Sequence, residues 1–260
     1  MPNLTEFVAD LARSLGFLGR LPVPARFFQD HDGSVSRAVR AFPMAGLVLS
    51  APAALALWLL LEWEAAPSLA ALIALSINTV LTGALHEDGL ADTADGFGGG
   101  RDREHALSIM KDSRTGSYGV IALVLSFGLR AAALASLAQG SAALPALALL
   151  SAAACSRALM VMHWHATSPA RPGGVASGAG RPEGTARKFA LASALLIALI
   201  LLPACAGLIP SLLALGLALA CVHGFTRYAE GRIGGHTGDT IGAAQQAGEI
   251  VFLTALALAV

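Results

Sequence analysis

The sequence predicts an all-α integral membrane protein: a polytopic helix bundle with about seven transmembrane helices and one amphipathic helix at its N-terminus. Of its 260 residues, 55% are hydrophobic and only 13% are charged, whereas soluble domains carry roughly 25% charged residues. The chain also contains a series of almost uncharged runs near 20 residues long, the length that crosses a bilayer as a helix. So few charges cannot cover a water-soluble body of this size, and lipid must therefore solvate much of its surface.

The amphipathic helix and the spans follow one another along a single domain, residues 1–260. Residues 4–18 place apolar side chains at three- and four-residue spacing, which is typical of a helix that lies on a membrane or packs on a bundle. Seven spans are expected, at Ala41–Leu61, Ala65–Leu85, Tyr118–Ala138, Ala142–His163, Phe189–Leu208, Pro210–Phe225 and Ile241–Val260. The last run qualifies only if Glu249 is buried or lies near the membrane surface.

The distribution of Lys and Arg predicts the orientation, because basic residues accumulate in cytoplasmic loops. They populate the N-terminal segment and the connections after the second, fourth and sixth spans, and the other connections contain none. We therefore expect a protein of the cytoplasmic (inner) membrane with its N-terminus and long loops inside. A net charge of zero argues against nucleic acid as a partner. The many small residues permit close helix packing and a homo-oligomer without specifying one.

The most informative stretch is the acidic motif at residues 86–100, HEDGLADTADGFGGG. On a helix Asp88, Asp92 and Asp95 share one face, where like charges repel. No lysine nearby neutralises them, and a divalent cation such as Mg²⁺ prefers carboxylate oxygens. Glu87 either joins the ligands from the edge of the helix or supports them from behind. The alternative, a solvated acidic face, fits less well because the motif directly follows a span and is interleaved with small residues.

A second candidate is the glycine-rich loop at residues 234–243, GGHTGDTIGA. Asp239 is a candidate metal ligand or base, and Thr237 and Thr240 are candidate donors to phosphate oxygens. A glycine-rich turn with a capping aspartate explains the same pattern equally well. His86 and His236 border the two motifs as possible supporting groups.

Basic residues complete the chemistry expected of a diphosphate site, where a metal bridges phosphate oxygens and cations stabilise the leaving group. Lys111, Arg114 and Ser117 lie together before the third span, although the cytoplasmic bias alone also accounts for the two cations. Further substrate-binding candidates are Arg20, Arg171 and Arg157. The last of these lies inside a span and needs a buried acidic or phosphate partner.

At these residues the sequence resembles the cobalamin synthase family, the cobalamin-5'-phosphate synthases or adenosylcobinamide-GDP ribazoletransferases. The matching pieces are Phe17–Pro24, Phe42–Gly46, His86–Gly96, Met110–Val120, Ser156–Arg157, Ala170–Gly174 and Gly238–Gln246. They run in family order across nearly the whole chain, and the acidic motif is the most specific of them.

The resemblance implies a Mg²⁺-dependent reaction late in cobalamin synthesis. A ribose hydroxyl of α-ribazole, or of its 5'-phosphate, attacks the cobinamide-bearing phosphoryl group of adenosylcobinamide-GDP. GMP leaves, and adenosylcobalamin or its 5'-phosphate forms. In this reaction we expect Asp88, Asp92 and Asp95 to bind Mg²⁺, and Asp239 to complete the site or accept the proton. The two cations before the third span would hold the GDP phosphates.

Two other classes of protein compete with this interpretation. CDP-alcohol phosphotransferases also hold metal on helix-borne aspartates at the cytoplasmic face, but their motif includes an Ala-Arg pair that the acidic motif here lacks. Ion-coupled transporters bind their ion through acids near mid-span. Here the acids cluster at helix ends and in loops, which favours the enzyme.

Overall fold

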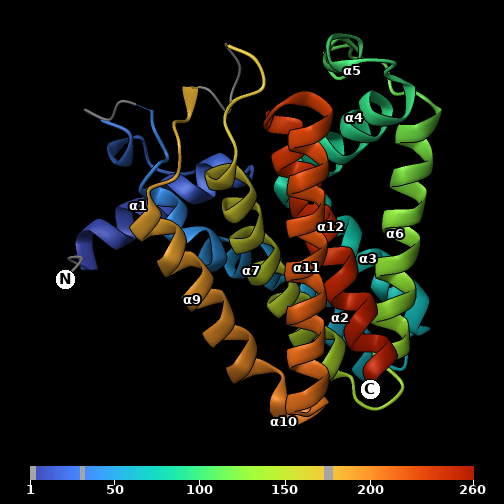
Figure 1. Ribbon diagram of the computed structural model, residues 1–260. Coiled ribbons are helices and arrows are strands. Elements are labelled where there is room, and N and C mark those ends of the chain that lie inside the picture. The colour runs from blue at the N-terminus through green and yellow to red at the C-terminus, as the bar shows by residue number, and fades with distance from the viewer. Residues whose placement is uncertain (1–3, 30–32, 173–177) are drawn as a thin grey trace.

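The computed structural model describes residues 4–29, 33–172 and 178–260, which form a bundle of long helices (Figure 1). The elements are α1 (Leu4–Leu18), η1 (Ala25–Phe27), η2 (Ala38–Ala41), α2 (Phe42–Glu62), α3 (Pro67–Thr82), α4 (Leu85–Gly99), α5 (Arg103–Ile109), α6 (Ser117–Leu137), α7 (Ala143–Ala166), α9 (Gly184–Leu201), α10 (Pro203–Ala206), α11 (Leu208–Ile233) and α12 (Gly238–Ala259). Across these ranges β-structure is limited to one isolated parallel bridge between Pro169 and His236. Gly173 and Gly174 of the predicted 170–174 motif lie outside the described residues.

Six segments of the described chain are long and apolar enough to cross a membrane: Ala38–Glu62, α6, α7, α9, α11 and α12. The pair α3 and α4 meets the same criteria only when taken together, and the two helices are bent by 92°. The polytopic bundle predicted from the sequence is therefore confirmed, with a count that reaches seven if the bent pair is one broken span.

The second span ends at a sharp bend and does not continue into the acidic motif. Gly83 and Ala84 both adopt left-handed backbone conformations, with φ of 64° and 57°. This conformation costs glycine little and costs alanine about 1–2 kcal/mol. Residues 67–84 carry no charge, and the first charged side chains, Glu87 and Asp88, come just after the bend. The carboxylates of the acidic motif therefore all lie on α4, beyond the bend.

Helix α7 is the centre of the bundle. Its apolar window is 89% buried, whereas those of α9 and α11 are each 22% buried. Small side chains, among them Ala148, Ala152 and Ala158, let neighbouring helices approach it closely. The outer helices instead expose large apolar side chains, as α6 does with Val120, Ile121, Val124, Leu125 and Leu129. These exposed faces are suited to lipid.

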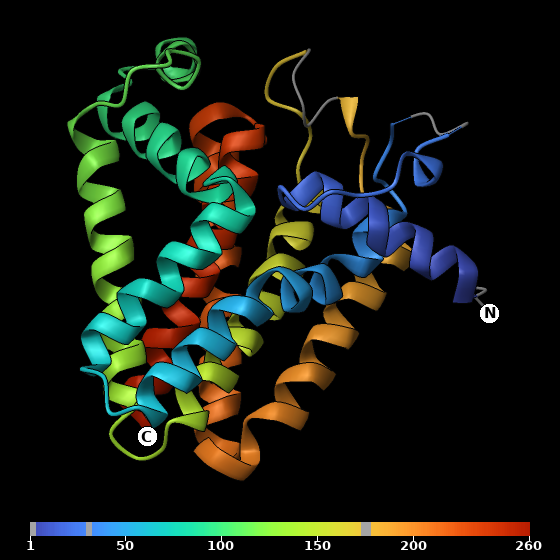
Figure 2. The ribbon, with the colours of Figure 1, turned by 180° about the vertical axis from the view of Figure 1, so that it is seen from behind.

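The two ends of the bundle differ in chemistry. Both ribbon views place α4, α5 and the first turn of α12 at one end, and α10 and the C-terminus at the other (Figures 1 and 2). The connections at residues 63–66, 138–142 and 202–207 contain no Lys or Arg. The functional motifs therefore gather at the end that also holds the long, basic connections.

Helix α1 is the predicted amphipathic helix, and a buried carboxylate attaches it to the bundle. Asp10 is 1% exposed and lies 3.4 Å from Arg13, 3.2 Å from Arg37 and 2.7 Å from Arg40. Three cations around one buried charge satisfy it fully. They hold α1 against η2 and so position the end of α1, which reaches the cavity described below.

Candidate active site

Helix α4 crosses the first turn of α12 at a point where glycines replace side chains. A Cβ at Gly89 would stand 2.7 Å from the backbone oxygen of Asp239, and one at Gly242 would stand 3.3 Å from Cα of His86. Only glycines allow two backbones to come this close. The crossing brings the acidic motif of α4 beside the aspartate of the glycine-rich loop, although the two are far apart in sequence.

Three carboxylates, those of Asp88, Asp92 and Asp239, form what we call the carboxylate cluster. Burial, together with the negative charges of Asp88, Asp239 and Asp95, raises the pKa of Asp92 to about 6. Arg171 acts in the opposite direction, and its guanidinium lies 3.7 Å from the carboxylate of Asp239. The cluster is held together against repulsion that one arginine offsets only in part, and a divalent cation relieves that repulsion.

The donor set of the cluster fits Mg²⁺ better than a cation that needs a complete protein cage. Within the described ranges, no three Asp, Glu, His or Cys side chains are arranged to enclose an ion by themselves. Mg²⁺ usually binds through one or two carboxylates and fills its remaining positions with water and substrate phosphate oxygens. Two carboxylates beside an open cavity match that requirement.

A short backbone bridge delivers Arg171 to the cluster. The amide of Ala170 donates to the carbonyl of His236 at 2.8 Å, and the amide of His236 donates to the carbonyl of Ser168 at 2.9 Å. Nη1 of Arg171 also donates to the carbonyl of Leu107 at 3.1 Å. The loop after α7 is thus tied to the start of α12 and to α5, which holds the guanidinium over the carboxylates.

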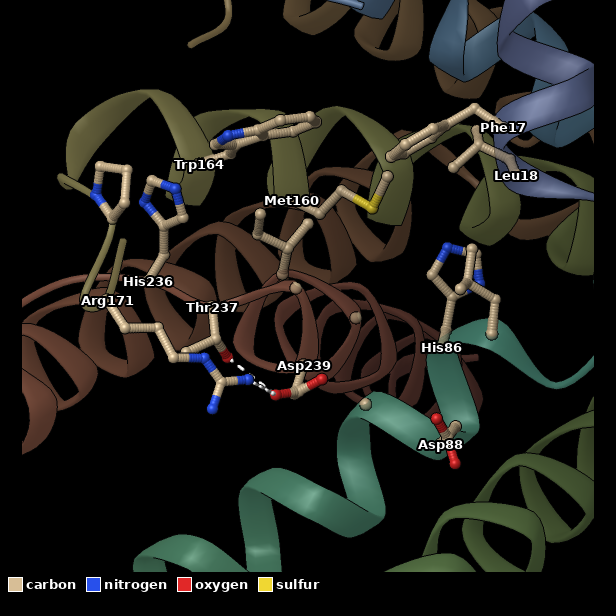
Figure 3. Close-up of a pocket in the computed structure, with 16 residues that line it drawn as sticks. Phe17, Leu18, His86, Asp88, Met160, Trp164, Arg171, His236, Thr237 and Asp239 are labelled. Atoms are coloured by element: carbon tan, nitrogen blue, oxygen red, sulfur yellow. Dashed lines mark hydrogen bonds and ion pairs between the residues drawn. The ribbon is translucent and has the colours of Figure 1, made fainter. Parts of the chain in front are cut away.

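A cavity of about 370 Å³ lies beside the cluster (Figure 3), within the usual size of small-molecule pockets. Its apolar lining comes from α1, α4, α7 and α12: Phe17, Leu18, Leu85, Met160, Trp164 and Ile241. Its polar lining consists of His86, Asp88, Arg171, His236, Thr237 and Asp239. Figure 3 shows Trp164, Met160 and Phe17 on one side and Asp239, Asp88 and Arg171 on the other. The cavity thus joins an aromatic wall to a charged one.

Glu87, predicted as a metal ligand or a supporting residue, and Arg157, predicted to bind substrate, both belong to a buried ion-pair network. Arg130 lies 3.0 Å from one oxygen of Glu249 and 3.5 Å from Glu87, and Arg157 lies 3.2 Å from the other oxygen of Glu249. Gln246 donates to Glu87 at 3.1 Å. The partner that Arg157 requires inside its span is therefore a carboxylate of the protein and not a substrate phosphate.

Asp95 and Thr240 also differ from the expectation. Asp95 accepts hydrogen bonds from the amides of Gly116 at 2.6 Å and Gly119 at 2.9 Å, so it caps the start of α6 instead of facing the cluster. Thr240 is fully buried, and its hydroxyl lies 2.9 Å from the Thr237 amide. That geometry is a helix cap and offers nothing to a phosphate. Thr237, the other member of the cap, does line the cavity.

The remaining predicted basic residues lie outside the cavity lining. Arg114 pairs with Asp112 at 2.6 Å and its side chain is 87% exposed, while Lys111 and Ser117 are exposed beside it. Arg20 is exposed and packs its side chain over Gly83 at the bend. The structure therefore brings Arg171 to the cluster and leaves the Lys111–Ser117 group at the surface.

The sequence analysis did not predict the aromatic wall or the buried histidine of α7. A tryptophan in an apolar run has the same pattern whether it faces lipid or a cavity, so Trp164 gave no signal. His163 is fully buried and lies 3.0 Å from the hydroxyl of Thr226 and 3.2 Å from that of Thr240. Two histidines at the end of an otherwise apolar run were the available hint of a polar interior.

The tautomer of His236 follows from its surroundings. Burial lowers the pKa of His236 to about 4, so the ring is neutral at pH 7. Nδ1 lies 2.9 Å from the hydroxyl oxygen of Thr167, and that hydroxyl donates to the carbonyl of His163 at 3.1 Å. The hydroxyl hydrogen is therefore committed, and Nδ1 of His236 must donate to the oxygen. Nε2 is left as an unprotonated acceptor.

Comparison with known proteins extends over the whole chain. A family model described as cobalamin-5-phosphate synthase matches residues 10–257. The chain is 54% identical to an adenosylcobinamide-GDP ribazoletransferase of Sinorhizobium sp over 98% of each protein. It is 52% identical to that of Sinorhizobium medicae over the full length of both, and 43% identical to that of Brucella anthropi over 98% of each. No solved structure matches.

Proposed function

Because this chain belongs to the cobalamin-5-phosphate synthase family, we propose that it joins α-ribazole, or its 5'-phosphate, to adenosylcobinamide-GDP. The products are adenosylcobalamin, or its 5'-phosphate, and GMP. Relatives that are 52% and 54% identical over nearly the full length are adenosylcobinamide-GDP ribazoletransferases. The chain is accordingly a transferase of cobalamin synthesis, and the CDP-alcohol phosphotransferase and transporter interpretations are set aside.

The observation that carries the site assignment is that Asp88, Asp239 and Arg171 line one cavity, while Asp92 lies close enough for their charges to shift its pKa. A diphosphate is itself strongly anionic, so carboxylates attract it only through a bound cation. We assign Asp88 and Asp92 as ligands of Mg²⁺. When bound, Mg²⁺ neutralises diphosphate oxygens and makes the phosphorus a better electrophile.

Asp239 and Arg171 account for the proton released by the attacking hydroxyl and for the charge that develops on the leaving GMP. The attack forms a new P–O bond to the acceptor ribose and breaks the P–O bond that joins GMP to the cobinamide phosphate. The hydroxyl proton passes to Asp239, which lines the cavity and accepts a hydrogen bond from Thr237 at 3.1 Å. Arg171 donates to an oxygen of the leaving GMP and stabilises its developing charge.

We place this end of the bundle on the cytoplasmic side of the inner membrane. The support is the absence of Lys and Arg from the connections at residues 63–66, 138–142 and 202–207, together with the tendency of basic residues to stay inside. A cytoplasmic site also has direct access to the nucleotide-bearing substrate, which is too polar to partition into lipid.

The substitution Asp92→Asn tests the assignment. Removing one ligand of a metal that stabilises the transition state is expected to slow GMP release on the order of 100-fold or more. The assay uses purified protein in detergent with adenosylcobinamide-GDP, α-ribazole and a Mg²⁺ titration. Asp112→Asn is the matched control, because Asp112 pairs with Arg114 at the surface and should leave the rate unchanged. Near-normal GMP release from Asp92→Asn, or full activity in EDTA, refutes the site.

A further inference from the structure

Three buried nitrogen atoms of the cavity lining have no hydrogen-bond partner among the described residues. They are Nε2 of His86, Nε2 of His236 and Nε1 of Trp164, and their residues are 2%, 2% and 1% exposed. Buried polar atoms are almost always paired, because leaving one unpaired costs roughly 1–3 kcal/mol. Three such atoms around one cavity (Figure 3) indicate that a ligand supplies the missing partners.

The aromatic rings of the lining indicate that the ligand is flat. Phe17 lies nearly parallel to Trp164, with ring centroids 6.2 Å apart and an interplanar angle of 19°. Phe42 continues the stack behind Phe17 at 5.9 Å and 22°. Rings in this arrangement present a planar apolar surface, on which another aromatic ring stacks favourably.

The polarity of two of these nitrogens, those of Trp164 and His236, restricts which ligands can pair with them. Nε1 of Trp164 only donates, so it requires an acceptor in the ligand. Nε2 of the neutral His236 ring is an acceptor and therefore requires a hydroxyl or N–H donor. A nucleoside whose base has one free ring nitrogen and whose ribose carries hydroxyls supplies both, with the base acting as the acceptor and the sugar as the donor.

We propose that this cavity binds the acceptor nucleoside, with its benzimidazole base on the Phe17–Trp164 wall and its ribose toward His236 and the carboxylate cluster. The assignment rests on the proposed function for the identity of the substrates. Trp164 donates to the free ring nitrogen of the base, and a ribose hydroxyl donates to His236. This arrangement places the attacking sugar beside Asp239, where the proton has to go.

The other substrate fits the cavity poorly. Guanine carries several donors and acceptors around its ring, and a wall of Phe17, Leu18, Met160 and Ile241 would leave most of them unpaired. The corrin macrocycle with its amide side chains is too large for about 370 Å³. Adenosylcobinamide-GDP therefore reaches the cluster from outside, with only its diphosphate entering the charged end of the cavity.

The intrinsic tryptophans provide a binding test that needs no turnover. The chain has three tryptophans, and the other two, Trp58 and Trp63, are 39% and 75% exposed away from the cavity. A Trp58→Phe/Trp63→Phe double variant leaves Trp164 as the only reporter. α-Ribazole alone should change its fluorescence saturably, and GMP should not. A response to GMP without one to α-ribazole, or no saturable response to α-ribazole, overturns the proposal.

Steady-state kinetics separate this inference from the proposed function. In Trp164→Phe the stacking surface remains and one hydrogen bond is lost, so the KM for α-ribazole should rise about 10-fold while the KM for adenosylcobinamide-GDP stays unchanged. The indole riboside, which has C–H in place of the ring nitrogen, should be about 10-fold poorer for the wild type and equally good for Trp164→Phe.

Trp58→Phe is the control for both kinetic measurements and should behave as the wild type. If the KM of adenosylcobinamide-GDP rises instead, the cavity holds the other substrate and the inference fails while the transferase activity stands. If the wild type releases no GMP under any condition, the proposed function itself fails, and the fluorescence titration still reports which ligand the cavity binds.

Discussion

The four carboxylates of α4 divide according to what their oxygens contact. Oε1 of Glu87 is paired by Arg130 and Gln246, although its buried Oε2 has no partner among the described residues. Asp95 accepts hydrogen bonds from two backbone amides at the start of α6. Asp88 and Asp92 have no such partners among the hydrogen bonds and ion pairs of the described chain. A carboxylate already held by a cation or by backbone amides has little to offer a metal, whereas one without such partners beside like charges gains most from it.

This division predicts opposite phenotypes for two neighbouring aspartates. Asp95→Ala leaves the amides of Gly116 and Gly119 without their acceptor, so it should destabilise the protein by about 1–3 kcal/mol. The Mg²⁺ concentration for half-maximal activity should not change. Asp88→Ala should instead raise that concentration on the order of 10-fold or more while the melting temperature is retained.

Thermal unfolding in detergent and Mg²⁺ titrations of GMP release measure the two effects. An Asp95→Ala variant with normal stability and a raised Mg²⁺ requirement would return Asp95 to the ligand set that the sequence predicted.

At the scale of elements, the site depends on how closely two helices cross. Helices α4 and α12 meet at Gly89 and Gly242, where a Cβ on Gly89 would lie 2.7 Å from the backbone oxygen of Asp239. Separating the two backbones would cost free energy, because Arg130 pairs with Glu87 of α4 and with Glu249 of α12 and so ties the same two helices together. The spacing of the carboxylate cluster is therefore set by the absence of two side chains.

Gly89→Ala should separate Asp88 and Asp92 from Asp239. Because the added methyl group meets backbone and not a flexible side chain, the helices must move apart. Catalysis that needs groups placed to a fraction of an ångström should then fall by roughly 100-fold. Gly224→Ala on α11 is the control, since its Cβ would meet open space. GMP release measures both variants, and equal rates would show that the crossing does not position the site.

At the scale of the whole molecule, charge separates the two ends of the bundle. The end with α10 has connections free of Lys and Arg, and the opposite end holds the carboxylate cluster and the long basic connections. The apolar faces of α6, α9 and α11 between them expose large aliphatic side chains. This arrangement is the basis for our proposal that the carboxylate cluster faces the cytoplasm.

The predicted orientation is open to direct labelling. Cys205 in α10 is exposed, while Cys155 is buried. In intact cells made permeable only at the outer membrane, a membrane-impermeant maleimide should label Cys205. A Cys205→Ser variant that also carries Ser113→Cys, in the exposed α5–α6 connection, should be labelled only after the inner membrane is opened. The reverse pattern would place the cavity on the periplasmic side.

Much of this architecture could be predicted from the sequence, because a bilayer restricts the composition of every segment that crosses it. Each span must be apolar for about 20 residues, so the helices of the bundle, the amphipathic α1 and the end that holds the acidic motif were all predicted. The bend at Gly83 and Ala84 was not predicted. An uncharged stretch of sequence predicts a membrane span, but it does not indicate that two of its residues adopt a left-handed backbone conformation.

The sequence by itself determined the class of protein, its family and the acidic motif, because composition and local spacing carry that information. Only the tertiary structure decided which carboxylates remain unsatisfied, that Arg171 and not Lys111 or Arg114 reaches them, and that Trp164 and Phe17 wall a cavity beside them. Those outcomes depend on the crossing of α4, α7 and α12. Contacts between residues far apart in the chain leave no pattern in any one segment of it.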